Sequence, residues 1–330
     1  LDYRLQADSP LKGAGLGGHD IGGYGRPGGR IFYVSPDGDD ANPGTSERQP
    51  FATLAKACAE LQPGDTLYVM QGKWAERLIV ARGGTAEAPI TIRAHGRKLV
   101  TLPAIGISGD GVVVEGLKVA WTRGDRVRIT GDVVTIRAHD RESALPPGIR
   151  IRGDSIAVEG FTIADGRGDG IMVTGDLVTI RECFTGSPGG AGIRAIGAAG
   201  LSVEHCTLMG NRFGLSLEQG SIAATVRDCM LAYNRDGAVV ISDDSAAGYL
   251  GSSNCYWGDG LDAERIAGEI GSVIGDPGVP LMPDWDSPAA TLAMYGRPAG
   301  VQPLLTREPE ITDIEVATLS DDAAVITWRT

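Results

Sequence analysis

Short runs of alternating apolar and polar residues recur along this chain, and each run ends near a charged residue. The seven copies are ITIRAH, VVVEGL, VTIRAH, IAVEGF, VTIREC, LSVEHC and ATVRDC. Alternation of this kind is the pattern of a β-strand with one buried face. The charged residues are spaced by 22, 22, 22, 22, 23 and 23 residues and alternate in sign: Arg93, Glu115, Arg137, Glu159, Arg181, Glu204 and Arg227. A fixed period of this size indicates a solenoid, in which one repeat stacks on the next.

A second apolar run occurs in the same repeats, and a glycine opens most of its copies. The copies include VRIT, IRIR, IMVT, IRAI and LSLE, and the glycines are Gly148, Gly170, Gly192, Gly214 and Gly237. With a short third run such as FTIA or CTLM, each repeat of about 22 residues forms one three-stranded coil of a parallel β-helix. Successive coils would stack at about 4.8 Å. Like charges at that spacing would repel each other, whereas alternating charges attract and disfavour a slip by one coil.

The second residue after each charged residue is predicted to point into the core. These residues form the column His95, Leu117, His139, Phe161, Cys183, Cys206 and Cys229. Stacked cysteines have Cβ atoms about one coil apart, beyond the ~3.5–4.5 Å of a disulfide, so we expect buried free thiols rather than a redox or metal site. Cys58 and Cys255 make the number of cysteines odd, which also argues against a disulfide framework. Asn211 and Asn234 are expected to satisfy the backbone groups of turns rather than to take part in catalysis.

Composition and chain ends limit the partners. The net charge is -12 and the pI is about 4.8, so nucleic acid is not an expected partner. No apolar run approaches the roughly 18 residues that a membrane-spanning helix needs. The chain begins with Leu1 rather than Met, so we interpret it as a processed or excerpted piece whose export signal would be missing.

The two ends of the chain do not follow the repeat. Residues 1–30 are rich in glycine, and their phrase YGRPGG returns as YGRPAG at residues 295–300. We interpret residues 1–30 as the tail of a preceding β-helix module, 31–285 as the β-helix itself, and 286–308 as a linker or tail. A tandem or self-assembling array would explain the repeated phrase.

The sequence that begins at Ile31, IFYVSPDGDDANPGTSERQPFATLAKACAELQPGDTLYVMQG, resembles the opening of secreted right-handed parallel β-helix proteins of the pectate-lyase-like superfamily. NCYWGDG and IGDPGVP, further along, resemble their closing phrases. The resemblance covers about residues 31–300. It implies an all-β fold, a right-handed single-stranded parallel β-helix of three strands per coil with an N-terminal capping helix. The apolar residues on one face of that helix are Phe51, Leu54, Ala55, Cys58 and Leu61.

Residues 309–330, PEITDIEVATLSDDAAVITWRT, resemble the first two strands of a fibronectin type III domain. Two strands alone are marginally stable in water. We therefore expect this segment to pack on another chain or on a neighbouring module.

Arginines gather on the predicted outer face of the strands that the glycines open. Four of them lie on neighbouring coils, and the loops before these strands add one arginine and two aspartates: Arg128, Arg150, Arg152, Arg194, Arg167, Asp165 and Asp169. Ser216 and Glu218 continue the same outward positions. The resemblance implies that enzymes of this superfamily work in a groove over one such sheet, and arginine binds carboxylates in bidentate geometry. We therefore interpret these residues as a solvated face of mixed ion pairs, with a groove for acidic glycans as the alternative.

The chain carries no catalytic set that can be transferred from the resemblance. The aspartate pair and Gly-His-Gly phrase of polygalacturonase-like hydrolases and the Asp-Pro-His phrase of mannuronan epimerases do not occur. Asp165 and Asp169 are the carboxylate pair that hydrolysis would use. Lys118, a candidate base, is predicted to lie on a third strand away from the arginines.

Two groups of carboxylates are candidates for calcium. Asp37, Asp39 and Asp40 lie in DGDDAN, which lacks the spacing and the closing glutamate of a full calcium loop. The second group recurs every 22 residues: Asp110, Asp132, Asp154 and Asp176. Hydrogen bonds to turn amides would satisfy both groups. The sequence therefore requires no cofactor, and calcium is the one candidate cofactor that these carboxylates leave open.

Two functions fit these observations. The first is an extracellular structural or adhesive module of a large, tandem or filament-like surface protein, which contacts copies of itself or neighbouring modules through its ends and binds acidic polysaccharide without cleaving it. The alternative is a polysaccharide lyase or related carbohydrate-active enzyme that acts on polymers containing uronic acids.

Overall fold

We describe a computed structural model of the chain. It describes residues 29–96, 99–119, 127–138, 144–145, 148–164, 168–186, 189–257, 269–270, 272–274, 312–320 and 323–329. The chain separates into two units, Leu1–Gly275 and Asp276–Thr330.

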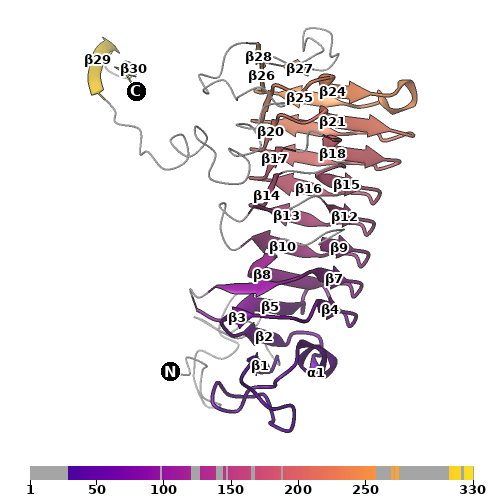
Figure 1. The fold of residues 1–330 in the computed structure, drawn as a ribbon. Helices are drawn as coiled ribbons and strands as arrows, with labels where there is room; N and C mark the ends of the chain where they lie inside the picture. Colours follow the sequence, from indigo (N-terminus) through magenta and orange to yellow (C-terminus); the bar gives the residue numbers. More distant parts are fainter. Residues whose placement is uncertain are drawn as a thin grey trace, which may run out of the picture. The chain divides into compact units, whose positions relative to one another are not determined.

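The first unit is a parallel β-helix with three sheets (Figure 1). Sheet 1 contains β4 (Leu78–Val80), β7 (Ile105–Ile107), β9 (Val127–Ile129), β12 (Ile149–Ile151), β15 (Ile171–Val173), β18 (Ala191–Ile196), β21 (Phe213–Glu218) and β24 (Gly237–Ile241). Sheet 3 contains β11 (Ala144–Leu145), β14 (Thr162–Ala164), β17 (Phe184–Gly186), β20 (Thr207–Met209), β23 (Met230–Ala232), β26 (Cys255–Trp257) and β28 (Val273–Ile274).

Sheet 2 lies between sheets 1 and 3 in the chain order of each coil. Its strands are β1 (Ile31–Val34), β2 (Thr66–Val69), β5 (Ile90–Ala94), β8 (Val112–Val119), β10 (Thr135–Ala138), β13 (Ala157–Glu159), β16 (Thr179–Arg181), β19 (Ser202–Glu204), β22 (Thr225–Arg227), β25 (Leu250–Ser252) and β27 (Glu269–Ile270). Two short strands, β3 (Gly72–Lys73) and β6 (Val100–Leu102), pair beside it. The 3-10 helix η1 (Asp243–Ser245) follows β24.

The charged residues of sheet 2 form the predicted ladder. Strand register pairs each with its opposite on the next coil, for example Arg137 with Glu159. Glu115 contacts both Arg93 and Arg137 at 2.6 Å. Glu159 pairs with Arg137 and Arg181 at 2.5 Å, and Arg227 pairs with Glu204 at 2.8 Å. The prediction that opposite charges lie on adjacent coils is confirmed.

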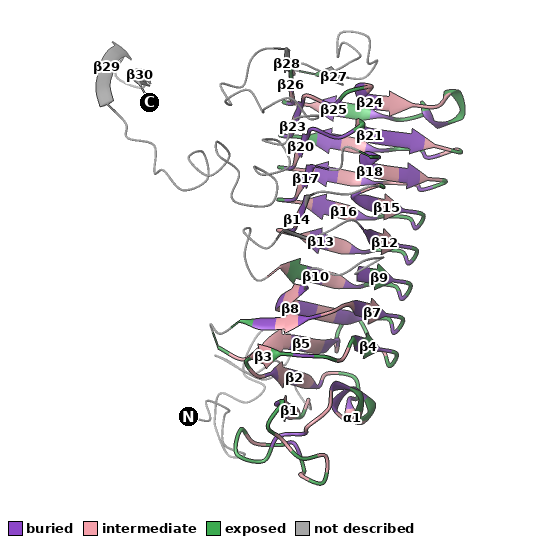
Figure 2. Cartoon of the chain, viewed as in Figure 1, coloured by how far each residue is buried: buried purple, intermediate pink, exposed green. Residues whose placement is uncertain are grey.

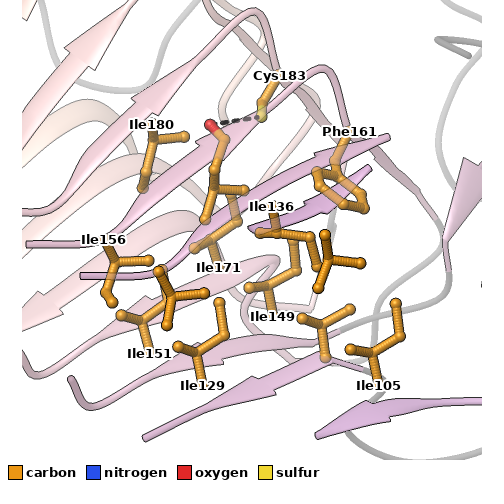
Figure 3. Packing of buried hydrophobic residues seen from close by; sticks show 14 of the residues in the cluster. Ile105, Ile129, Ile136, Ile149, Ile151, Ile156, Phe161, Ile171, Ile180 and Cys183 are labelled. Carbon is orange, nitrogen blue, oxygen red and sulfur yellow. Dashed lines mark hydrogen bonds between the residues drawn. The ribbon is translucent and has the colours of Figure 1, made fainter. Parts of the chain in front are cut away.

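The core is made of aligned aliphatic side chains from the three sheets, and Figure 2 colours the buried residues of the strands purple. Isoleucines such as Ile129, Ile151 and Ile171 come from successive strands of sheet 1, and Ile136 and Ile180 come from sheet 2 (Figure 3). Each coil buries these side chains only against the neighbouring coils. The free energy of unfolding is therefore close to a sum of contributions from the individual coils and from the interfaces between neighbouring coils.

The predicted inward column is correct for most of its members. Five of them are buried: Leu117, Phe161, Cys183, Cys206 and Cys229. Cysteine thiols among the described residues are free, as expected. His139 lies outside the described residues.

For His95 the prediction was wrong. Its side chain is 31% exposed, contacts Glu47 at 3.2 Å, and stands edge-on to Tyr33 and Tyr68. In β5 the strand continues straight past Arg93, so Ala94 packs against the core and His95 points outward. In later coils a residue with positive φ follows the charged one, such as Glu182 (55°) or His205 (49°), and turns the next residue inward.

The helix α1 (Leu54–Glu60) packs against β4, at the first coil. Thr53 caps it by accepting a hydrogen bond from the backbone N of Lys56. Leu54 and Cys58 are buried as predicted, and so are Phe51 and Leu61 just outside the helix. Ala55 is exposed, contrary to the prediction, and Ala57 takes the buried position on that face. The helix covers a sheet edge that would otherwise expose unpaired backbone groups.

The second unit contains a two-stranded antiparallel sheet, β29 (Thr312–Ser320) and β30 (Ala323–Arg329). The likeness to a fibronectin type III domain and its packing on a partner stay predictions. The predicted linker 286–308, and nearly all of the predicted tail 1–30, lie outside the described residues.

Candidate functional site: the outer face of sheet 1

The predicted arginines do lie on one face of sheet 1. Strand register places one residue of each coil in a single file along the sheet: Arg128, Arg150, Met172, Arg194 and Ser216. Arg128 and Arg152 are exposed, and Arg150 is half-buried. Arg152 follows the end of β12, and its backbone N donates to the carbonyl of Ile129 on the preceding coil.

Arg150 and Met172 are in direct contact. The Nη1 of Arg150 lies 2.8 Å from the Sδ of Met172, one coil further along. The thioether is only a weak acceptor, so this contact helps to orient the guanidinium. Arg128 and Arg150 lie in register on neighbouring strands, at a spacing of about 4.8 Å.

Arg194 lies between two carboxylates. Its Nε donates to Asp169 Oδ2 at 2.9 Å, and its Nη1 donates to Glu218 Oε1 at 2.5 Å. Burial alone would lower the pKa of Arg194, but the attraction and hydrogen bonds of the two carboxylates raise it. Ser216, itself buried, donates from Oγ to the same Oε1 of Glu218 at 2.6 Å. The side chains of three successive coils are thus tied together.

Glycines at the start of the sheet 1 strands make room for polar side chains from the preceding turn. A Cβ on Gly192 would lie 2.3 Å from the Oγ1 of Thr185 and 2.9 Å from the Nδ2 of Asn211. A Cβ on Gly214 would lie 3.0 Å from the Nδ2 of Asn234 and 2.4 Å from the carbonyl oxygen of Ala238. Gly237 is displaced by one position from this set, because it pairs with Phe213 and not with Gly214.

The asparagines of these turns act as predicted. The Nδ2 of Asn211 donates to the carbonyl of Thr185, and the Nδ2 of Asn234 donates to the carbonyl of Leu208. The Oδ1 of Asn234 accepts from the backbone N of Asn211. Asn254 instead continues the cysteine column: its Oδ1 accepts from the backbone N of Cys229, and its Nδ2 donates to the carbonyl of Val226. The role of Asn211 and Asn234 is to satisfy buried backbone groups at the edge of the site.

The other predicted site residues divide into three groups. Asp165 and Arg167 lie outside the described residues. Asp169 is in the site, although its partner is Arg194 and not a second loop aspartate. Glu218 and Ser216 were placed on the outer face by the sequence but given no role. The contact of Glu218 with Arg194 spans 24 residues and that of Ser216 with Glu218 spans 2, and no phrase in the sequence signals the longer one.

Two of the carboxylates proposed for calcium in DGDDAN, those of Asp39 and Asp40, accept hydrogen bonds from backbone groups. Asp40 accepts from the backbone N of Ala52 and Thr53 and from Thr53 Oγ1. Burial raises the pKa of Asp40, but these hydrogen bonds outweigh it and the pKa is lowered. Asp39 accepts from Ala41, and Asp37 donates from its backbone N to Ser35.

The periodic aspartates bind backbone amides of the following coil. Each Oδ1 accepts from a backbone N one coil along, as when Asp110 accepts from Asp132 at 2.8 Å and Asp176 accepts from Ala199 at 2.8 Å. Within the described part of the chain, no three His, Cys, Asp or Glu side chains are grouped as a metal site would require. The calcium prediction therefore has no added support from this structure.

Comparisons with known proteins agree with the fold. The profile of a family described as "Right handed beta helix region" matches residues 125–258. Solved structures similar to this chain include carbohydrate-active β-helix enzymes. One is the pectate lyase Pel9A, with a TM-score of 0.57 and 14% identity, covering 75% of this chain and 77% of that one. The chain is therefore a right-handed parallel β-helix, and identity this low shows the fold alone.

Two curated relatives match a shorter stretch. The uncharacterized protein YwoF of Bacillus subtilis (strain 168) is 40% identical over 84 residues, which is 26% of this chain and 17% of YwoF. A lacto-N-biosidase of Bifidobacterium longum subsp. longum is 38% identical over 88 residues, which is 24% of this chain and 6% of the enzyme. The chain thus matches only a small part of either relative.

Proposed function

We propose that this chain is a carbohydrate-binding module of a secreted or cell-surface protein, and that an acidic polysaccharide lies along the outer face of sheet 1. The adhesive or structural role expected from the sequence fits this proposal, with the glycan as the partner. In the described part of the chain, no helix is long and apolar enough to cross a membrane.

The observation that carries the proposal is the placement of Arg128 beside Arg150. On sheet 2 every step of the charged ladder places opposite signs in register. On sheet 1 the same coils place two arginines in register, although the protein as a whole carries a charge of -12. Arginine binds carboxylates in bidentate geometry, so arginines aligned on neighbouring strands favour a ligand that carries carboxylates.

The test is binding of pectate and alginate oligomers, measured by titration calorimetry at two salt concentrations. We expect Arg150→Glu to abolish binding, because it places a carboxylate where the ligand's carboxylate would lie. The same substitution places opposite signs in register between β9 and β12, and urea unfolding of the variant shows whether the fold is kept. Arg48→Glu, at an exposed loop position remote in sequence from these coils, is the control for net charge.

Equal binding by the Arg150→Glu variant and the wild type would contradict the proposal. So would failure of the wild type to bind any uronic-acid polymer at low salt, where charge attraction is strongest.

The second candidate function is that of a polysaccharide lyase. The specific support is the fold shared with a pectate lyase, together with several arginines aligned on one face. An arginine there could neutralise the sugar carboxylate. Release of unsaturated sugar, read as ultraviolet absorbance, would establish the lyase if it is lost in Arg150→Gln. Binding without product formation supports the passive module.

A further inference from the structure

A second group of basic side chains lies on the first coils, on a face other than that of sheet 1. Strand register places Lys73 of β3, Thr101 of β6 and Lys118 of β8 side by side on three neighbouring strands. Lys118 lies between Leu117 and Val119, which are both buried in the core, so the alternation of the strand turns its own side chain outward. We call Lys73, Thr101 and Lys118 the lysine column.

The lysine column lies on the same face as sheet 3. Gly116, with a φ of 72°, bends β8 directly after a carboxylate of the charged ladder, and Gly160, with a φ of 74°, bends the chain after another. Two residues beyond these glycines, Lys118 and Thr162 take equivalent positions, and Thr162 lies on β14 of sheet 3. The arginines of β9 and β12 lie on sheet 1. A ligand on sheet 1 therefore leaves the lysine column open.

The described part of the chain does not compensate the charges of these two lysines. The side chains of Lys73 and Lys118 form no ion pair or hydrogen bond with a described residue. The third described lysine, Lys56, does form one, with Glu60 at 2.6 Å. The protein as a whole is acidic, with 42 Asp and Glu against 30 Lys and Arg. Two ammonium groups on one face, without carboxylate partners, therefore make a local basic site on an acidic protein.

The lysine column is also arranged so that little order has to be imposed by a ligand. Lys118 is half-buried, so its methylene stem packs on the protein and limits the positions of its ammonium group. Thr101, also half-buried, lies between the two lysines. Its hydroxyl makes no hydrogen bond with a described residue, whereas the hydroxyls of Thr130 and Thr174 donate to backbone carbonyls. A donor and acceptor is thus available between two cations, at a small entropy cost.

Resting on the acidic polysaccharide proposed above as ligand, we infer that the lysine column is a second site for it, so that one module binds two polymer chains on two faces. The lysines lie two strand spacings apart, about 9.6 Å. In an extended polymer of uronic acids with two sugars per turn, alternate sugars turn their carboxylates to the same side, and two sugars cover a similar length. One such chain gives a carboxylate to each lysine and a sugar hydroxyl to Thr101.

Two sites on different faces change what the module does to a polysaccharide. A protein with one site only coats a polymer, whereas a protein with two sites joins one chain to another. Once several modules are bound along a chain, each further contact forms at a high effective concentration, so weak sites together hold firmly. Cross-linking of this kind is what an adhesive role requires.

The experiment combines titration calorimetry with tetramannuronate and light scattering with long polymannuronate, both at low salt. The wild type should bind two tetramers per chain and raise the scattering of the polymer by cross-linking it. Lys73→Gln/Lys118→Gln should bind one tetramer, and so should Arg150→Glu, which removes the sheet 1 site. Each of these variants should coat the polymer without cross-linking it. Salt at about 1 M should weaken both sites, because the Debye length falls to roughly 3 Å.

A single substitution and a matched control sharpen the test. Lys118→Gln alone should weaken the second site about tenfold, the effect of losing one hydrogen bond between charged groups. Lys56→Gln/Arg48→Gln removes the same number of positive charges outside both sites, one from α1 and one from an exposed loop. It should bind two tetramers and cross-link the polymer as the wild type does. Urea unfolding of each variant checks that the fold is kept.

The outcomes separate the two proposals. Two tetramers per chain in Lys73→Gln/Lys118→Gln would overturn the lysine site and leave the proposed function in place, and equal losses in the control variant would also overturn it, because net charge alone would then attract the polymer. A single site in the wild type that is lost only in Lys73→Gln/Lys118→Gln would support the lysine site and overturn binding on sheet 1. A single site lost only in Arg150→Glu would do the reverse. Failure of the wild type to bind would overturn both.

Discussion

Replacing Glu159 with glutamine should destabilise the β-helix by about 1 kcal/mol. The carboxylate lies between Arg137 and Arg181, at 2.5 Å from each, and its side chain is 17% exposed. Exposed ion pairs contribute roughly 0.2–1 kcal/mol each, so the two together contribute about 0.4–2 kcal/mol. Glutamine keeps the shape of the side chain and one acceptor, so the substitution measures charge rather than packing. Glu159→Arg, which replaces two attractions with two repulsions, should cost about twice as much.

The measurement is urea unfolding followed by circular dichroism, with the midpoint and the slope compared between variants. The slope should stay constant, because the surface exposed on unfolding does not change. In about 1 M salt the Debye length falls to roughly 3 Å, so the difference between Glu159→Gln and the wild type should shrink. Asp243→Asn, at an exposed position in η1, is the control and should stay within about 0.5 kcal/mol of the wild type.

The pH dependence has a definite sign. Burial raises the pKa of Glu159, but the hydrogen bonds and charges of Arg137 and Arg181 outweigh it, so the pKa is lower in the folded state than its ordinary value. The stabilisation is therefore fully present above the unfolded pKa of about 4.3 and is lost as the pH falls through the folded value. Destabilisation that is equal at low and high salt, and equal at pH 7 and pH 3.5, would show that the ladder acts through packing and would refute this reasoning.

Three further predictions concern the interior. Gly192→Ala should destabilise the fold by about 1–3 kcal/mol, because the new Cβ would lie 2.3 Å from Thr185 Oγ1; the thermal midpoint measures this. Asn234→Ala should cost about 1–3 kcal/mol or more, because it leaves buried backbone groups without partners, and faster amide exchange in the adjoining coils would show it. Burial raises the pKa of Cys58 to about 12, and the hydrogen bond that the Cys206 thiol donates to Cys183, together with burial, raises the pKa of Cys206, so iodoacetamide at pH 8 should label neither until urea unfolds the protein. Intact-mass spectrometry reads that result, and rapid labelling of the native protein would contradict it.

The fold could be predicted from the sequence because it rests on a period. In a parallel β-helix each repeat forms one coil, so equivalent positions of successive repeats lie in register on neighbouring coils. Residues separated by one period, such as Arg137 and Glu159, are therefore in contact. The errors arose where a single residue changed the path of the chain. His95 points outward because Ala94 continues the strand, whereas His205, with a positive φ of 49°, turns the corner in a later coil. Helical periodicity likewise named Ala55 where Ala57 packs against the core.

The site was predicted less completely, since its decisive contacts do not follow the period. The sequence placed Arg194 on the outer face, but its pairing with Asp169 and Glu218 depends on side chains reaching one coil down and one coil up. Long side chains at outward positions can choose among several neighbours, and apolar patterning does not distinguish these choices. The carboxylates in the DGDDAN phrase show the same limit, because their backbone partners are set by how the loop folds onto α1.

Both charged faces of this β-helix contain a charged side chain that pairs with two side chains of opposite sign. On sheet 2 a carboxylate such as Glu159 joins two arginines, and the alternation continues coil after coil, which is the arrangement that lowers the energy of the folded state. Among the described residues of sheet 1, Arg194 joins two carboxylates, whereas Arg128 and Arg150 lie in register with each other on β9 and β12. Both sheets are built from the same coils, so the fold itself does not require this difference in the order of charges. In this β-helix, strict periodicity marks the residues that hold the coils together, and we propose that the departure from it on sheet 1 marks the face that binds a ligand.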